Sequence, residues 1–201
     1  ASEGFVARGG SRAVMLVQDR RGEKWELAFL DLEREAIVRE RDGPDFSRYR
    51  KVRWAADGSL VFSEFHERER GRGARLALAA LAPGAERPAE FYRVEAPDVW
   101  LRFSPDVRWA LVALKDARGL ITGYELVDVV ERRSQPLALL GRPALHTVSW
   151  SSDGKALAYA THLEGDQTLV VAYPSDRRVV RSYVEGDGRI RRVALSAGGR
   201  L

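Results

Sequence analysis

Several residue types are missing or scarce in this chain of 201 residues, and each absence excludes some chemistry. Cysteine is absent, which removes disulfides, thiolate metal sites and cysteine nucleophiles and leaves the redox compartment open. The three histidines, His66, His146 and His162, are too few and too scattered to suggest a multi-histidine metal site. Asparagine is absent and lysine occurs only four times against 29 arginines, a usage typical of thermophilic proteins or of a GC-rich genome.

Hydrophobic residues make up 45% of the chain and charged residues 31%, a balance that supports a folded core and excludes wholesale disorder. The net charge is +4, but basic and acidic residues are interspersed and no long basic arm occurs, which argues against nucleic-acid binding. No apolar run reaches the roughly 18 residues that a membrane-spanning helix needs, so the sequence predicts no transmembrane segment.

One segment recurs along the chain at a nearly constant spacing. Its clearest copies are residues 52–62, 101–111 and 148–159, and weaker copies lie near the two ends. Each copy is anchored by an aspartate or a glycine in a turn, and successive anchors are 45 to 49 residues apart: Gly9, Asp57, Asp106, Asp153 and Gly198. A fixed period of this length indicates a repeat architecture.

Each repeat is predicted to contain short β-strands joined by tight turns. A bulky apolar residue stands three positions before every anchor, and in four copies another stands five positions before it, the spacing of a strand with one buried face. A pair such as Asp57-Gly58 supplies the positive φ of a tight hairpin. Two further alternating runs complete the unit. Four antiparallel strands in each unit of about 45 residues predict an all-β protein of the β-propeller type.

The turn segments carry a resemblance to a known family. Residues 103–106 read Phe-Ser-Pro-Asp, and residues 150–155 read Trp-Ser-Ser-Asp-Gly-Lys. Both resemble the W/F-S-P-D-G-K signature of TolB-like propeller repeats, which are similar in shape to WD repeats, although the WD dipeptide is lacking here. Departures occur, because Val107 stands where the signature has glycine, and Ala56 and Ser152 stand where it has proline. The resemblance implies the fold, and it slightly favours a periplasmic or other extracytoplasmic location without deciding it.

The repeats predict about four four-stranded antiparallel blades, which form a single propeller domain or propeller fragment over residues 1–201. The blades cover approximately residues 4–43, 50–94, 98–139 and 146–185, with an extra strand at 190–195. The ring closes if that strand completes the first blade, which would remove the open sheet edges. The interpretation we favour is an incomplete ring, whose missing blades lie outside the chain or are supplied by another chain.

No catalytic constellation is evident in the sequence. A Gly-x-Ser-x-Gly nucleophile elbow and the strand–helix alternation of a hydrolase domain are both absent. The recurring Asp57, Asp106 and Asp153 are interpreted as turn residues. The acidic glycine turns at 164–166 and 185–188 lack the ligand spacing of an EF-hand and are interpreted as turns between strands. The sequence therefore predicts no catalytic, cofactor-binding or metal-binding residue.

The preferred hypothesis is a non-catalytic propeller scaffold that mediates protein–protein interaction as part of a larger complex. The alternative is the substrate-gating propeller domain of a prolyl-oligopeptidase-type serine hydrolase, whose catalytic domain would lie outside this chain. Fold alone does not choose between the two, and the identity of a protein partner does not follow from the sequence.

One loop and one tryptophan are candidates for partner binding. The loop is rich in arginine and glycine, which suits contacts with carboxylate or phosphate, although a solvated loop of balanced charge is the alternative interpretation. Its candidate residues are His66, Arg68, Arg70, Arg72 and Arg75. Trp100 is opposite in phase to its apolar neighbours, so we expect it at the mouth of the propeller channel or against a neighbouring blade.

Overall fold

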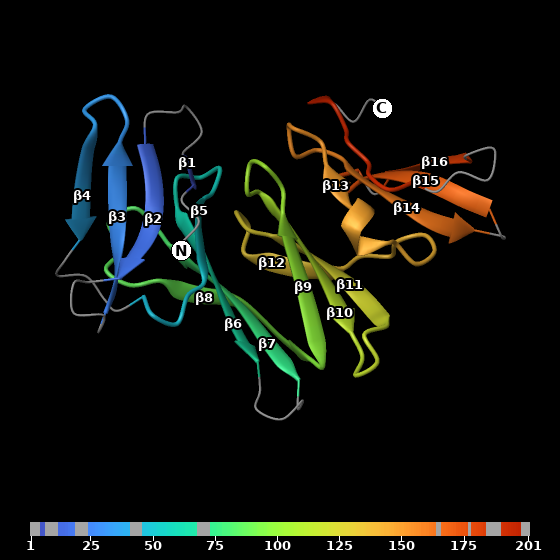
Figure 1. Ribbon diagram of the computed structural model, residues 1–201, viewed down its shortest axis with the longest axis horizontal. Coiled ribbons are helices and arrows are strands. Elements are labelled where there is room, and N and C mark those ends of the chain that lie inside the picture. The colour runs from blue at the N-terminus through green and yellow to red at the C-terminus, as the bar shows by residue number, and fades with distance from the viewer. Residues whose placement is uncertain are drawn as a thin grey trace.

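The chain folds into four β-sheets that follow one another along the sequence (Figure 1). The computed structural model describes residues 5–6, 12–18, 24–40, 46–67, 73–163, 166–176, 178–183 and 190–197. Within these residues each sheet has four antiparallel strands, which keep their sequence order across the sheet. The prediction of an all-β chain with four four-stranded antiparallel blades is confirmed.

The sheets are named blades 1 to 4 in chain order. Blade 1 contains β1 (Phe5–Val6), β2 (Arg12–Gln18), β3 (Trp25–Asp31) and β4 (Ala36–Glu40). Blade 2 contains β5 (Lys51–Trp54), β6 (Leu60–Glu67), β7 (Ala74–Leu81) and β8 (Ala89–Ala96). Blade 3 contains β9 (Asp98–Phe103), β10 (Trp109–Lys115), β11 (Ile121–Asp128) and β12 (Arg133–Pro136). Blade 4 follows the short 3-10 helix η2 (Leu145–Thr147) and contains β13 (Ser149–Trp150), β14 (Leu157–Leu163), β15 (Asp166–Tyr173) and β16 (Arg178–Tyr183).

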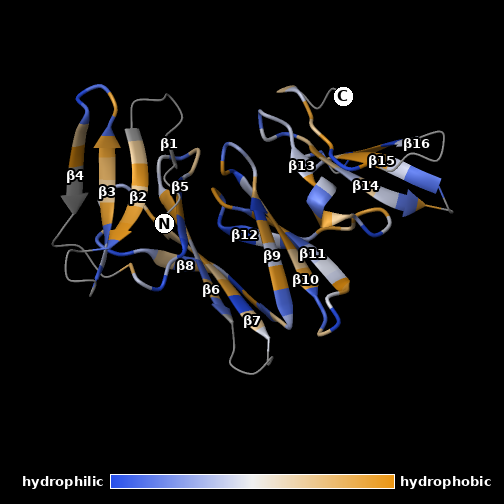
Figure 2. Ribbon diagram, in the orientation of Figure 1, coloured by the Kyte–Doolittle hydropathy of each residue, from blue (hydrophilic) through white to orange (hydrophobic). Residues whose placement is uncertain are grey.

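Apolar side chains from facing sheets form a separate core between each pair of successive blades. Apolar residues follow the strands and polar residues gather at the turns (Figure 2). Between blades 1 and 2, Val52 and Leu27 are buried, and the rings of Phe29 and Trp54 lie 6.1 Å apart. Each fully buried side chain of this size stabilises the fold by roughly 1.5–3 kcal/mol. Similar cores join blades 2 and 3 and blades 3 and 4, so neighbouring blades stabilise one another.

A buried serine closes the first hairpin of blades 3 and 4. The Oγ of Ser151 donates to Asp153 Oδ1 at 2.7 Å and accepts the backbone N–H of Ala156 at 2.9 Å. Ser104 repeats the arrangement in blade 3, where it donates to Asp106 Oδ1 at 2.6 Å. Both serines are fully buried, so these contacts satisfy polar groups that water does not reach. Asp106 and Asp153 are thus turn residues, as the sequence predicts.

Val107 occupies the turn position where the repeat signature has glycine. Its φ is 55°, in the left-handed region, which costs a residue with a side chain about 1–2 kcal/mol. Its side chain is buried in the core between blades 2 and 3, and burial of a valine stabilises by roughly 1.5–3 kcal/mol. The gain from burial therefore offsets the backbone strain in this copy of the repeat.

The C-terminal segment lies against blade 4 and not against blade 1. Leu195 forms a parallel bridge with Ser151, and Val193 and Leu195 pack on the face of blade 4. Blade 1 takes its own first strand from β1. Instead of the extra strand expected at 190–195, the structure has a single bridge at Leu195. Pairing of this segment with blade 1 is not formed, and ring closure is not found among the described residues.

Candidate functional site

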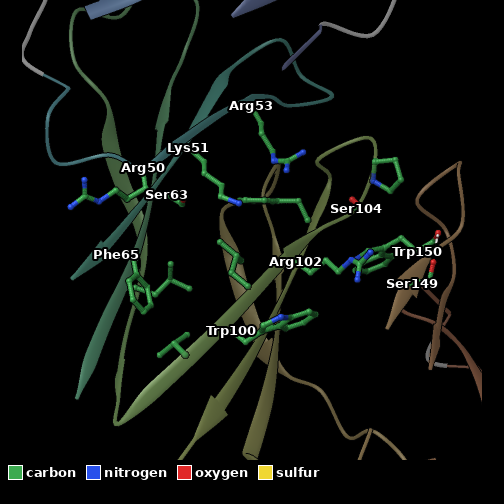
Figure 3. Close-up of a pocket in the computed structure, with 15 residues that line it drawn as sticks. Arg50, Lys51, Arg53, Ser63, Phe65, Trp100, Arg102, Ser104, Ser149 and Trp150 are labelled. Carbon is green, nitrogen blue, oxygen red and sulfur yellow. Dashed lines mark hydrogen bonds between the residues drawn. The ribbon is translucent and has the colours of Figure 1, made fainter. Parts of the chain in front are cut away.

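A cavity of about 630 Å³ opens where the first strands of blades 2, 3 and 4 converge (Figure 3). Its lining comes mainly from β5, β9, the turn after β9 and β13, with additional side chains from β6 and β7. A volume of this size is typical of sites that bind small molecules or short peptide segments. The cavity belongs to no single blade, because it exists only where the three sheets meet.

The cavity is basic. Four lining residues are cationic, Arg50, Lys51, Arg53 and Arg102, but the side chain of Arg50 extends away from the other three. Aspartate and glutamate do not occur among the described lining residues. Figure 3 shows Lys51 and Arg53 extending from β5 towards β9, and Arg102 extending towards Trp150. Positive charges gathered in a recess with low-dielectric walls concentrate the local potential and attract anions.

The alternation of side chains along a strand explains how charged side chains reach the cavity. In β5, Val52 and Trp54 pack into the core towards blade 1, so Lys51 and Arg53 face the opposite way. In β9, Val99 and its alternate neighbours pack towards blade 2, which leaves Arg102 on the other face of the strand. In β5 one face serves the core and the other the cavity, whereas residues on both faces of β9 line the cavity.

Aromatic rings form the apolar part of the lining, and they come from Phe65, Trp100, Phe103 and Trp150. The guanidinium of Arg53 lies over the ring of Phe103, with Cζ 5.5 Å from the ring centroid. Such stacking orients a guanidinium while its N–H groups at the edge point outward. The lining thus combines cations with flat apolar surface.

A buried carboxylate lies beside the cavity and is neutralised within blade 2. Glu64 is buried and accepts hydrogen bonds from Arg48 Nε at 2.8 Å and from Arg75 Nη2 at 3.2 Å, and it also contacts His66 Nε2. Burial would raise the pKa of Glu64, but the hydrogen bonds from His66 and Arg48 and the charge of Arg48 outweigh it, so the pKa lies below its ordinary value. Glu64 is therefore a paired structural anion.

The structure describes three of the six predicted partner-binding residues. His66 and Arg75 face each other across β6 and β7 and both contact Glu64, and neither is among the cavity lining residues. Trp100 lies on β9 and lines the cavity, and it packs against the core between blades 3 and 4. The other three predicted residues lie outside the described residues: Arg68, Arg70 and Arg72. A partner-binding role for the set stays a prediction.

Sequence analysis missed the cationic residues of the cavity, although a signal for them was present. Lys51, Arg53 and Arg102 alternate with apolar residues in strands whose buried face was recognised. Charges at alternate positions in the first strands of two neighbouring repeats point to a shared central face. Among the described residues, His, Asp and Glu side chains form no group of three that could hold a metal ion. Within the same residues, no helix has the length and apolarity to cross a membrane.

Comparison with known proteins identifies the fold. No family model and no curated protein matches the sequence. TolB from Acinetobacter baumannii matches with a TM-score of 0.53 and 13% identity, over 89% of this chain and 42% of that one. Oligogalacturonate lyase from Vibrio parahaemolyticus matches with a TM-score of 0.64 and 13% identity, over 90% of this chain and 53% of that one. Dipeptidyl peptidase 4 from Porphyromonas gingivalis matches with a TM-score of 0.58 and 13% identity, over 96% of this chain and 34% of that one.

The matched lyase and peptidase differ in their named activities, so the similarity concerns architecture and not chemistry. The chain spans 42% and 53% of the first two structures and about a third of the peptidase. Over about nine-tenths of its length, the chain has the fold of TolB-like β-propellers.

Proposed function

We propose that this chain is a non-catalytic β-propeller domain that binds a protein partner through the central cavity. The observation that carries the proposal is the cavity itself, a recess lined by the first strands of three blades and by the cationic side chains of Lys51, Arg53 and Arg102. Its described lining also lacks histidine, aspartate and glutamate, the side chains that most often act as general bases. These features suit the binding of a ligand, which involves no covalent chemistry.

The scaffold around the cavity supports a binding role. Val52 on β5 and Val99 on β9 are buried in the cores towards neighbouring blades, so the strands that carry the cationic side chains are fixed on one face. A binding site built on packed strands loses little conformational entropy when a ligand binds, because its backbone is already ordered. The partner would therefore meet a preformed surface.

A second candidate function is the substrate-gating propeller of a serine peptidase. This candidate is favoured by the similarity to acylaminoacyl peptidase from Pyrococcus horikoshii, with a TM-score of 0.56 over 90% of this chain and 32% of that one. In that case the protein partner is a hydrolase domain, and the cavity lies on the route of a peptide substrate. A partner that instead supplies further blades would contact blades 1 and 4.

Site-specific photo-crosslinking tests the binding proposal. A benzophenone amino acid replaces Pro105, an exposed residue of the cavity lining, and a matched chain carries it at Leu120, an exposed residue in the β10–β11 turn. After irradiation in extract from the native cell, we expect one saturable protein adduct from position 105 and none from position 120. Adducts that are equal at both positions, or absent from both, would contradict the proposal.

A further inference from the structure

We propose that the open edge of β16 in blade 4 binds an extended, acidic segment of a protein partner as an added β-strand. This surface is separate from the central cavity, because no residue of β16 is among the cavity lining residues. β16 is the outermost strand of its sheet, and among the described residues it pairs only with β15 (Figure 1). Its other edge therefore presents backbone N–H and C=O groups to a further strand.

Two apolar rows across blade 4 end at β16 without cover. In the first row, Val180 lies opposite Val171, which is buried together with Leu195. In the second row, Val179 lies opposite Ala172, which is also buried. The exposed fractions of Val179 and Val180 are nevertheless 40% and 47%. Adjacent residues of a strand point to opposite faces, so each face of blade 4 has one exposed valine at this edge.

The outermost strand of blade 2 shows how the end of such a row is covered elsewhere in this chain. Tyr92 on β8 lies opposite Leu78 and is buried in the core between blades 2 and 3. In β16, by contrast, every residue from Arg178 to Ser182 is exposed. A partner strand along β16 would extend both apolar rows and cover the two valines, which is favourable because it removes apolar surface from water.

The charges of β16 select the kind of strand that binds. Arg178 and Arg181 flank the two valines, and β16 contains no aspartate or glutamate. Within the described part of the chain, the side chain of Arg181 makes no ion pair or hydrogen bond. The guanidinium of Arg178 lies over the ring of Tyr173, with Cζ 4.0 Å from the ring centroid. Such stacking leaves the N–H groups at the edge of the guanidinium available to a carboxylate, so acidic side chains of the partner would complement both arginines.

The pairing of strands in a sheet converts this pattern into a sequence motif. Residues opposite each other in neighbouring strands lie on the same face and in contact. The segment from Arg178 to Arg181 therefore fits a partner segment of two apolar residues between two acidic residues. A second copy of β16 fits poorly. Antiparallel pairing that places the valines opposite each other also places Arg178 opposite Arg181 of the second copy, and like charges in opposite positions are destabilising.

Fluorescence anisotropy with defined peptides tests the inference. The probe is a capped, fluorescein-labelled peptide with the core Glu-Val-Val-Glu, and the control peptide has the core Gln-Val-Val-Gln. We expect the glutamine peptide to bind at least about tenfold more weakly, because it cannot form the charge-assisted contacts. Two further glutamate peptides are N-methylated at alternate residues, so that each lacks one alternating set of N–H donors. Only one of these two should lose binding, because only one set of N–H groups of an added strand points towards β16.

Reversal of charge on both sides of the interface tests the same contact in the protein. The double variant Arg178→Glu/Arg181→Glu should lose the glutamate peptide and gain binding of a peptide with the core Lys-Val-Val-Lys, a gain that an unfolded chain would not show. Arg133→Glu is the matched control, because it reverses an exposed charge on β12, the outermost strand of blade 3. This control should bind the glutamate peptide as the unmodified chain does.

Several outcomes would overturn the inference. Absence of binding, equal affinity for the glutamate and glutamine peptides, or an equal loss in Arg133→Glu would refute recognition of acidic residues by β16. Equal binding of the two N-methylated peptides would refute strand addition. A dimer of the unmodified chain in sedimentation equilibrium that the glutamate peptide dissociates would assign the edge to a second copy of the chain. The binding role of the cavity is tested separately, because the crosslink at position 105 does not involve β16.

Discussion

Ser151→Ala should destabilise the chain far more than the substitution of its neighbour, Ser152→Ala. Ser151 is fully buried, and its Oγ accepts the N–H of Ala156, which is also fully buried. Alanine cannot accept that hydrogen bond, so a buried backbone donor is left without a partner. The same substitution removes the hydrogen bond from Ser151 to Asp153. Ser152 is exposed, so its replacement by alanine should hardly change the stability of the chain.

The expected magnitude follows from these two contacts. A buried donor left unsatisfied costs about 1–3 kcal/mol, and the second bond adds less because Asp153 is only partly buried and water can replace the lost donor. We expect Ser151→Ala to lower the free energy of unfolding by about 2–3 kcal/mol and the melting temperature by about 5–10 °C. Ser152→Ala should change the free energy of unfolding by less than about 0.5 kcal/mol.

Chemical denaturation followed by tryptophan fluorescence measures both variants against the unmodified chain. The loss in Ser151→Ala should appear as a lower transition midpoint with an unchanged slope, since the surface exposed on unfolding is the same. Ser104→Ala should behave similarly, because Ser104 makes the same contacts in blade 3. Midpoints of Ser151→Ala and Ser152→Ala that coincide would refute the assignment of the buried serine as the residue that closes the turn.

Three further predictions concern a close approach, a buried anion and a buried phenol. Gly154→Ala should destabilise the chain more than Gly58→Ala, which should cost about 1–2 kcal/mol in thermal unfolding because its φ is positive. Gly154 also has positive φ, and there a Cβ would in addition meet Asp106 Cγ at 2.7 Å, so that carboxyl group must shift. Equal losses would refute this contact between the turns of blades 3 and 4. Glu64→Gln should destabilise by about 1–3 kcal/mol at pH 7. Because the pKa of Glu64 is lowered in the fold, this contribution is present above its ordinary pKa of 4.5 and is lost as pH falls through the folded value, so unfolding curves of the two chains should converge in acid. Burial raises the pKa of Tyr159 to about 12. The preference of the fold for the protonated phenol therefore stabilises the chain below pH 10, and this stabilisation is lost as the pH rises towards 12. A spectrophotometric titration in which every tyrosine ionises near pH 10 would contradict this prediction.

The repeat pattern was sufficient to predict the blades. A strand needs only alternation, and a hairpin needs only the right turn residues, both of which are local properties of the sequence. Trp54 and Trp150 therefore identified the buried face of their strands before the structure was known, and both pack in cores between blades. The turn role of Asp153 followed in the same way, because its partner Ser151 is two residues away.

The cavity and the position of the C-terminal segment depended on contacts between residues distant in sequence. Arg53 and Arg102 are separated by a whole repeat, and they line one cavity because the cores on either side of β9 set the positions of three blades. Leu195 could have paired with either end of the chain by its sequence alone. Its place beside Ser151 was decided by the apolar face of blade 4, which it covers. Local periodicity thus determined the strands and turns, whereas packing between sheets determined which side chains share the central cavity.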